Sequence, residues 1–290
     1  MKRNIRPTER ESGVSRIISC GTDAAMYSGL IDFFIVGAQK SGTTALSYYL
    51  SKHNNIEIGF NKEVHFFDNE EVDWHNPDYS LLHSAFERED SGKIVKGEAT
   101  PIYIYWPNSL ERLARYNPHA KLILCLRHPA YRAYSHWRME TTRRAETLSF
   151  VEAIAATGRE RVRSAIGGVH RVFSYVERGF YADQICRLQR LFAPSQVLYI
   201  RTDDLWTQTQ RTIDLVQSFL GATRELLVTP AYIVPVRSSA LGTLPATALR
   251  ELNSLYAPNI AETASLTGLP LAEWLHPDYR EPMIDGEFVR

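Results

Sequence analysis

The apolar residues of the chain gather in three short, nearly continuous runs. These are residues 31–37 (IDFFIVG), 121–126 (KLILCL) and 196–200 (QVLYI). Runs of this length are typical of parallel strands buried on both faces. Apolar residues recur at helical spacing after the first run, over residues 45–50, and after the third, over residues 208–220. The alternation of strands and helices predicts an α/β fold, in which a central parallel sheet carries helices on both faces.

The length of the chain favours a single domain. At 290 residues it can bury a full core and stays near the upper limit of one compact unit. Residues 1–28 are charged and interrupted by proline and glycine, and contain no apolar stretch long enough for a signal peptide or a membrane span. We therefore expect a poorly ordered lead-in at residues 1–28, one α/β domain at residues 29–290, and a cytoplasmic location.

Charge and cysteine content narrow the possible partners. The chain has 33 Lys and Arg against 33 Asp and Glu, so no overall field would draw it onto nucleic acid or an anionic membrane. Any anion site must therefore be local. Cys20, Cys125 and Cys186 are odd in number and widely spaced, which indicates buried thiols in a reducing compartment and not a disulfide framework or a metal site.

The segment GAQKSGTT, residues 37–44, lies where the first strand gives way to a helix. Backbone N–H groups at such a helix N-terminus form an anion site, and Lys40 adds a positive charge to it. The segment is not a Walker A loop, because Lys40 precedes Gly42 where GxxxxGK[ST] would require the lysine to follow the glycine. The alternative is a tight turn with a surface lysine.

A carboxylate and an imidazole stand close together in NKEVHFFD, residues 61–68. In an extended segment Glu63 and His65 would point to the same side, and the neighbouring aromatic residues would keep them partly desolvated. This pair is a candidate for a general base. The alternative is a strand end with one hydrogen-bonded histidine. No further His, Cys or carboxylate stands at ligand spacing, so we expect no metal site.

The segment LRHPAYRAYSHW, residues 126–137, begins at the carboxyl end of the second predicted strand. Ligands of open α/β sheets bind at this edge. Arg127 offers a guanidinium fork for a phosphate, and Ser135 adds a hydroxyl one or two helical turns later. The alternative is that Arg127 caps the strand end through a local carboxylate.

KSGTT, KEVHFFD and LRHPxxRxxSxW, in this order, resemble the motifs of the sulfotransferases that use 3′-phosphoadenosine 5′-phosphosulfate (PAPS). Within that family they resemble the heparan sulfate 3-O-sulfotransferase and N-sulfotransferase-like branch. The resemblance extends from residue 31 to about residue 274 and implies that residues 29–290 are a sulfotransferase domain. It implies that the 5′-phosphosulfate is held by Lys40, Ser41, Gly42, Thr43 and Thr44.

The resemblance assigns roles to five further residues. It implies that Arg127 and Ser135 bind the 3′-phosphate and that Glu63 is the catalytic base. It also implies that Tyr181, in RGFYADQ, flanks the nucleotide, and that Arg237, in PVRSS, belongs to a basic loop that closes over it.

One position departs from the family pattern. The heparan sulfate enzymes carry a lysine in E-K-[ST]-P-x-Y, where this chain reads GEATPIY with Ala99. Lys62 or Lys96 could substitute for that lysine. The acceptor therefore stays open between an oligosaccharide and a small metabolite. Four aromatic residues are candidates either for stacking on an acceptor ring or for the core: Trp74, Tyr103, Tyr105 and Trp106.

These assignments predict in-line transfer of a sulfonyl group from PAPS to a hydroxyl or amine, which leaves 3′-phosphoadenosine 5′-phosphate. Glu63 would accept the proton, with His65 orienting it or acting in its place, and Lys40 would stabilise the leaving phosphate. The sulfonyl group carries little charge of its own, so we expect no magnesium requirement.

Two other functions remain open from the sequence, and so does the oligomeric state. One is a homologue that binds the nucleotide without turnover, which the change at Ala99 favours. The other is a kinase, which would need a Walker B aspartate at the end of a buried strand. The strand at residues 121–126 is followed by Arg127 instead, which argues against the kinase.

Overall fold

Five parallel strands form the centre of the protein, in the order β2-β3-β1-β4-β5. The computed structural model describes residues 29–60, 62–86, 94–227 and 242–282. All four strand pairings among these residues are parallel, so the carboxyl ends of the strands share one edge of the sheet. The strands are β1 (Phe33–Gly37), β2 (Ile56–Ile58), β3 (Val95–Ala99), β4 (Lys121–Leu126) and β5 (Val197–Arg201).

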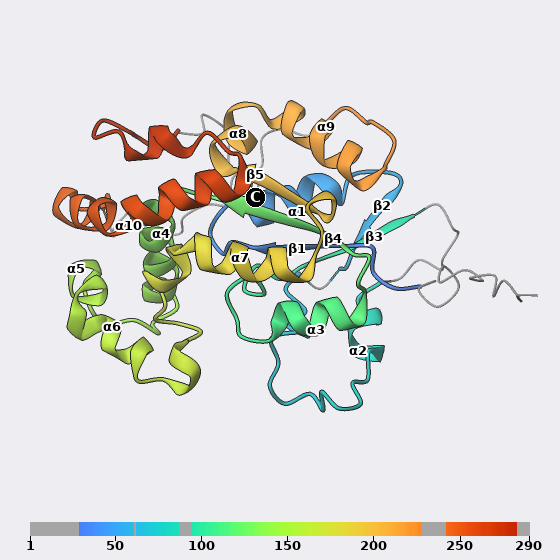
Figure 1. The fold of residues 1–290 in the computed structure, drawn as a ribbon, viewed down its shortest axis with the longest axis horizontal. Coiled ribbons are helices and arrows are strands. Elements are labelled where there is room, and N and C mark those ends of the chain that lie inside the picture. Colours follow the sequence, from blue (N-terminus) through green and yellow to red (C-terminus); the bar gives the residue numbers. More distant parts are fainter. Residues whose placement is uncertain (1–28, 61, 87–93, 228–241, 283–290) are drawn as a thin grey trace, which may run out of the picture.

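Helices cover both faces of this sheet (Figure 1), which confirms the predicted α/β fold. One face is covered by α1 (Thr43–Leu50), α8 (Thr202–Thr207) and α9 (Thr209–Leu220). The other is covered by α3 (Ser109–Tyr116), α4 (Pro129–Thr142), α7 (Tyr181–Leu191) and α10 (Ala246–Thr267). The shorter helices are α2 (Ser80–His83), α5 (Phe150–Ile154) and α6 (Ala156–Arg163), with single 3-10 turns at η2 (Ile166–Gly168), η3 (Glu177–Gly179), η4 (Pro194–Gln196) and η6 (Leu271–Leu275).

The unbroken apolar runs of the sequence arise because the central strands are buried on both sides. In β1, Phe33 and Ile35 pack with α1 and α9, whereas Phe34 and Val36 face the opposite cluster. Successive residues of a strand point to opposite faces, so a strand between two helical layers needs apolar side chains at every position. This pattern makes β1 visible in the sequence.

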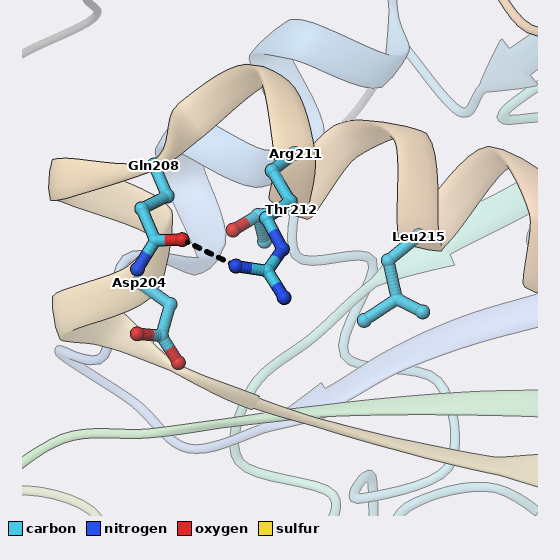
Figure 2. A pocket seen from close by; sticks show the side chains of 5 residues that line it. All are labelled: Asp204, Gln208, Arg211, Thr212 and Leu215. Carbon is cyan, nitrogen blue, oxygen red and sulfur yellow. Dashed lines mark hydrogen bonds between the residues drawn. The ribbon is translucent and has the colours of Figure 1, made fainter.

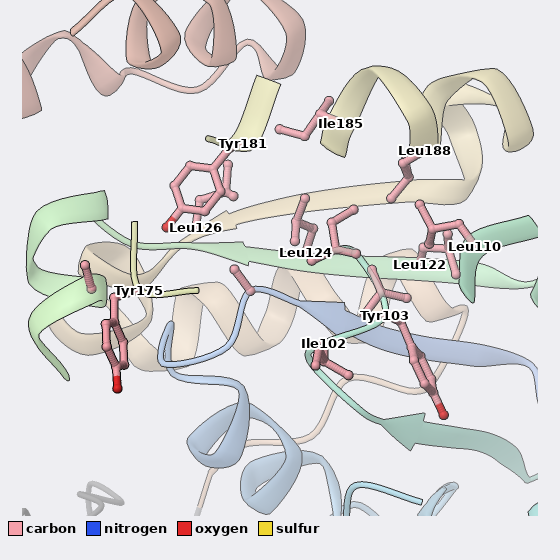
Figure 3. Close-up of a cluster of buried hydrophobic side chains, with 14 of the residues drawn as sticks. Ile102, Tyr103, Leu110, Leu122, Leu124, Leu126, Tyr175, Tyr181, Ile185 and Leu188 are labelled. Carbon is pink, nitrogen blue, oxygen red and sulfur yellow. The ribbon is translucent and has the colours of Figure 1, made fainter. Parts of the chain in front are cut away.

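The larger of the two cores lies between the sheet and α7. Figure 3 shows side chains of β4, among them Leu122 and Leu124, beside Ile185 and Leu188 of α7. All four are fully buried. This packing holds α7 across the sheet and places Tyr181, the first residue of α7, behind the carboxyl end of β4.

The three predicted strands correspond to β1, β4 and β5, but the sequence did not predict β2 or β3. The sequence of β3 is VKGEA, which has no apolar run. Its Gly97 lies in register with Phe33, and a Cβ atom on Gly97 would overlap the Phe33 ring. The strand is therefore fixed by its contact with β1, which its own sequence pattern does not reveal.

Two of the three cysteines lie among the described residues. Cys125 is buried in β4, as expected, whereas Cys186 in α7 is only half-buried. Cys20 and the whole of residues 1–28 lie outside the described residues.

Gly97→Ala is expected to lower the free energy of unfolding by about 1–3 kcal/mol, because the new methyl group must displace the Phe33 ring. Chemical denaturation would measure the loss. Phe33→Leu removes the obstacle. The loss in free energy of unfolding of the double variant should therefore be smaller than the sum of the two single losses, by about 0.5 kcal/mol or more. Strictly additive losses would show that the ring is not the cause.

Candidate functional site

The loop between β1 and α1 is held by hydrogen bonds to β4 and to Thr202. The Ala38 N–H donates to the Cys125 carbonyl of β4 at 2.8 Å. The Thr202 hydroxyl lies 2.9 Å from the Ser41 carbonyl and 3.0 Å from the Leu126 carbonyl. Thr202 therefore joins this loop to the end of β4, so that the first and third sequence segments share one edge of the sheet.

Two left-handed residues shape this loop. Lys40 has φ 71° and Gly42 has φ 83°, and Gly42 is the N-cap of α1 without a side-chain cap. The first intrahelical hydrogen bond runs from the Leu46 N–H to the Gly42 carbonyl at 3.0 Å. The N–H groups before it, those of Thr43 and Thr44 included, have no acceptor within the helix, which makes this end of α1 suited to an anion.

Lys40 lies among other cations. The charges of Arg127, Arg143 and Lys62 act on it against that of Glu63, and among the residues that the structure describes it forms no ion pair. Burial, followed by the charge of Arg127, lowers the pKa of Lys40 to about 8. A cation in such surroundings is stabilised when an anion binds beside it. The loop thus offers an excess of positive charge at the start of α1.

The second segment reaches this loop through Lys62. Its Nζ donates to Thr44 Oγ1 at 2.6 Å and lies 3.1 Å from Glu63 Oε1. Lys62 therefore occupies the space between the predicted anion loop and the predicted base. Lys96, the other candidate substitute for the family lysine, lies early in β3 beside Glu57, away from the carboxyl end of the strand.

Residues 62–68 are not an extended strand, which differs from the geometry assumed from the sequence. Glu63 and His65 both have left-handed φ values, 64° and 55°. The side chains nevertheless meet, with His65 Nε2 3.5 Å from Glu63 Oε2. The backbone turns because Glu98 and Thr100, at the end of β3, accept hydrogen bonds from the N–H groups of Val64 and His65.

His65 links two carboxylates. Its Nδ1 lies 2.9 Å from the buried Asp68 Oδ2, and Asp68 in turn pairs with Arg171. The hydrogen bonds with Asp68 and Glu63 raise the pKa of His65 to about 9. Burial works against ionisation of Glu63, but the hydrogen bond from His65 and the charge of Lys62 outweigh it and lower its pKa to about 2. At neutral pH the cluster holds ionised carboxylates around a protonated imidazole.

A third carboxyl group in this region was not anticipated. Glu98 is fully buried behind residues 62–68, and burial raises its pKa to about 7. Its side chain is hydrogen-bonded to Thr100. Ala99, between these two residues, points to the opposite face of the sheet into the core with α1. In the sequence, Glu98 lies in the GEATPIY segment, where only Ala99 was recognised as a departure from the family pattern.

Arg127 projects from the end of β4 toward the first loop. Its Nη1 donates to the Lys40 carbonyl at 2.9 Å, and its guanidinium lies 5.1 Å from the centre of the Trp206 ring. Glu281, near the end of the described chain, holds the Nε and Nη2 edge of Arg127. The sequence left open that Arg127 pairs with a local carboxylate. Arg127 does pair with a carboxylate, but this carboxylate is 154 residues away in the chain.

The other residues that were predicted to bind the nucleotide lie in different surroundings. Ser135 is half-buried on α4, two turns after Arg127. Tyr181 is only 2% exposed and donates to the Arg127 carbonyl at 2.8 Å, so it lies behind this loop and supports it. Arg237 lies outside the described residues.

A separate hollow of about 450 Å³ lies on the outer side of α8 and α9. Figure 2 shows its lining side chains, with Arg211 donating to Gln208 across it at 3.0 Å. The lining contains none of the residues singled out from the sequence: it consists of Asp204, Gln208, Arg211, Thr212 and Leu215. This hollow is distinct from the loop that carries Lys40.

No three His, Cys, Asp or Glu side chains within the described ranges are grouped so that they could hold a metal ion. No helix in the same ranges has the length and apolarity needed to cross a membrane.

Comparison with known proteins identifies relatives. A sulfotransferase domain family model matches residues 30–233. The membrane-associated sulfotransferase kil1 of Dictyostelium discoideum is 38% identical over 111 residues, which are 37% of this chain and 22% of the relative. Human heparan sulfate glucosamine 3-O-sulfotransferase 6 is 29% identical over 220 residues, which are 75% of this chain and 60% of the relative. The chain thus spans less than two thirds of the length of either relative.

The fold agrees with this match. A solved sulfotransferase from Alicyclobacillus acidocaldarius has a TM-score of 0.70 and 28% identity, over 84% of this chain and 98% of that one. The residues that match the family model include the loop with Lys40, the cluster around Glu63 and the end of β4 with Arg127, but not the segment with Glu281. The chain belongs to the sulfotransferase family.

Proposed function

We propose that this protein transfers a sulfonyl group from PAPS to a hydroxyl or amine of a saccharide-like or small-metabolite acceptor. The observation that carries the proposal is the contact of Lys62 with both Thr44 and Glu63. It connects an electropositive loop, suited to the donor, with a carboxylate suited to the acceptor. Both therefore lie within reach of one reacting sulfur atom at the edge of the sheet.

The donor fits the loop by charge. The 5′-phosphosulfate would lie at the start of α1, within reach of Lys40, Ser41, Gly42, Thr43 and Thr44. Lys40 has a lowered pKa and no described ion pair, so a phosphate that develops charge beside it gains a close counter-ion. The 3′-phosphate would bind Arg127 and Ser135. When bound, the donor supplies the sulfonyl group and a phosphate leaving group.

Glu63 is the proposed proton acceptor, and His65 its positioning residue. His65 is hydrogen-bonded to Asp68 and protonated at neutral pH, so it donates to Glu63 and cannot itself accept a proton. The acceptor oxygen or nitrogen forms a bond to sulfur, its proton passes to Glu63, and the bond from sulfur to the bridging phosphate oxygen breaks. The products are the sulfated acceptor and 3′-phosphoadenosine 5′-phosphate.

One place beside the Glu63 cluster is suited to a saccharide-like acceptor. Of the four aromatic candidates, Tyr103 is fully buried, whereas Trp106 is half-buried and stacks against Arg171 at 4.2 Å. Arg171 pairs with Asp68 and therefore lies next to the Glu63 cluster. A half-exposed indole beside a cation would suit the ring of an acidic sugar. Both relatives named above are sulfotransferases, and the human one is named for heparan sulfate.

Lys40→Ala and Arg127→Ala are each expected to weaken binding of 3′-phosphoadenosine 5′-phosphate by about tenfold or more, because each removes a charged hydrogen-bond donor. Calorimetric titration in the absence of metal would measure the dissociation constants. Arg211→Ala, in the hollow on α9, is the matched control and should bind as the wild type does. Failure of the wild type to bind would contradict the proposal.

Glu63→Gln is expected to lower kcat by about a hundredfold or more, since general base catalysis contributes about that much, and to leave nucleotide affinity nearly unchanged. Sulfate transfer from labelled PAPS to a panel of oligosaccharides and small alcohols would measure it. Glu71→Gln, at an exposed site nearby, is the control. Wild-type binding of the nucleotide without transfer to any acceptor would instead indicate a binding protein without turnover.

Nucleotide affinity is expected to fall as the pH rises through about 8. Lys40 has a pKa of about 8 without ligand, so it is charged below this pH and becomes neutral above it, where it no longer attracts the phosphate. Titrations between pH 7 and 9 would show the fall in the wild type and a flatter profile in Lys40→Arg, because arginine stays protonated. Equal profiles would exclude Lys40 as the titrating group.

A further inference from the structure

The end of the described chain crosses the edge of the sheet as a defined segment. We call residues 271–282 the C-terminal strap; it starts with the 3-10 turn η6 and continues to residue 282. It is the red segment that follows α10 in Figure 1, and its residues Trp274 and Glu273 contact Asp203 of α8 and Arg201 of β5. The strap thus lies next to the strand ends that carry the proposed donor site.

Asp203 holds the strap in place. Its Oδ2 accepts hydrogen bonds from Trp274 Nε1 at 3.0 Å and from the Tyr279 hydroxyl at 2.9 Å, and it also pairs with Arg201 Nη2 at 2.9 Å. The Tyr279 ring stacks on His128, with ring centres 5.0 Å apart and planes 10° from parallel. Two hydrogen bonds to one buried carboxylate, together with the stacking of Tyr279 on His128, fix the direction in which the strap continues.

This direction brings Glu281 onto Arg127. Glu281 Oε1 lies 2.5 Å from Nε and Oε2 lies 2.5 Å from Nη2, a bidentate pair. The two side chains are only 11% and 15% exposed. The third nitrogen of the guanidinium, Nη1, donates to the Lys40 carbonyl. A carboxylate and a phosphate bind the same fork of an arginine with the same geometry, so one excludes the other from that edge.

We propose that Glu281 is an internal competitor for the donor's 3′-phosphate, and that the nucleotide binds by displacing it from Arg127. This inference rests on the proposed function, in which Arg127 binds that phosphate. The exchange replaces one partly buried ion pair by another, so Arg127 is not left uncompensated in either state. The hydrogen bonds of Asp203 with Trp274 and Tyr279 do not involve Arg127 and can keep the rest of the strap docked while Glu281 moves.

The competition sets the apparent affinity. If Glu281 occupies Arg127 in about nine molecules of ten, the nucleotide binds about tenfold more weakly than it would to an unblocked site. The effect is confined to ligands that carry a 3′-phosphate. An adenine nucleotide without this group gains nothing from the release of Glu281.

The test is calorimetric titration of the full chain and of Glu281→Gln with 3′-phosphoadenosine 5′-phosphate and with adenosine 5′-monophosphate. The glutamine keeps the shape of the side chain and removes its charge. We expect the dissociation constant for the first ligand to fall about tenfold and that for the second, which lacks the 3′-phosphate, to stay the same. In an Arg127→Ala background, Glu281→Gln should change neither constant.

Two further variants separate competition from other effects of the substitution. Glu273→Gln removes a carboxylate of the same strap that pairs with Arg201 and does not contact Arg127, so binding should be unchanged. Tyr279→Phe removes one hydrogen bond to Asp203, loosens the strap without altering its charge, and should tighten binding of the 3′-phosphorylated nucleotide severalfold. Tyr279→Phe also serves if Glu281→Gln fails to fold.

The outcomes distinguish this proposal from the one on which it rests. Equal or weaker binding of 3′-phosphoadenosine 5′-phosphate by Glu281→Gln and Tyr279→Phe, beside measurable wild-type binding, would overturn the role of Glu281 and leave the proposed function intact. No binding by the wild type or by any variant would overturn the proposed function, and the competition with it. Equal gains for both nucleotides would also overturn competition at the 3′-phosphate.

Discussion

The parallel pairing of β1 with both β3 and β4 is the constraint on which the candidate site depends. It brings the ends of three strands, widely separated in the sequence, to one edge of the sheet. The loop with Lys40 follows β1, Arg127 follows β4, and the end of β3 holds residues 62–68 through Glu98 and Thr100. Hydrogen bonds of Thr202 and Lys62 then join these segments to one another.

The charges at this edge are unevenly compensated. Every charge in the cluster around His65 has a partner of opposite sign, because the carboxylates of Glu63 and Asp68 lie against the imidazolium and the cations Lys62 and Arg171. The loop with Lys40 is different, since Lys40 forms no ion pair among the described residues and the partner of Arg127, Glu281, lies in the C-terminal strap. The cluster around His65 is therefore held in place by its own ion pairs, while the loop with Lys40 is suited to an anion and the neighbouring Arg127 already binds one in Glu281.

The sequence predicted the parts of the fold and site that local patterns encode. Continuous apolar runs revealed β1, β4 and β5, and the residues that follow two of them include Lys40 and Arg127. It could not reveal β3, whose placement depends on the fit of Gly97 against Phe33. Nor could it find the pairing of Asp68 with Arg171 or of Arg127 with Glu281, because residues more than a hundred positions apart meet only once the sheet and helices have assembled.

The depressed pKa of Lys40 also has a chemical consequence. Ordinary lysines have pKa values near 10.4 and are almost wholly protonated in mildly alkaline solution, whereas about half or more of the Lys40 side chains are neutral there. A neutral amine is a nucleophile and an ammonium ion is not. In mildly alkaline solution Lys40 therefore supplies a nucleophilic amine at the edge of the sheet, which the ordinary lysines of the surface do not.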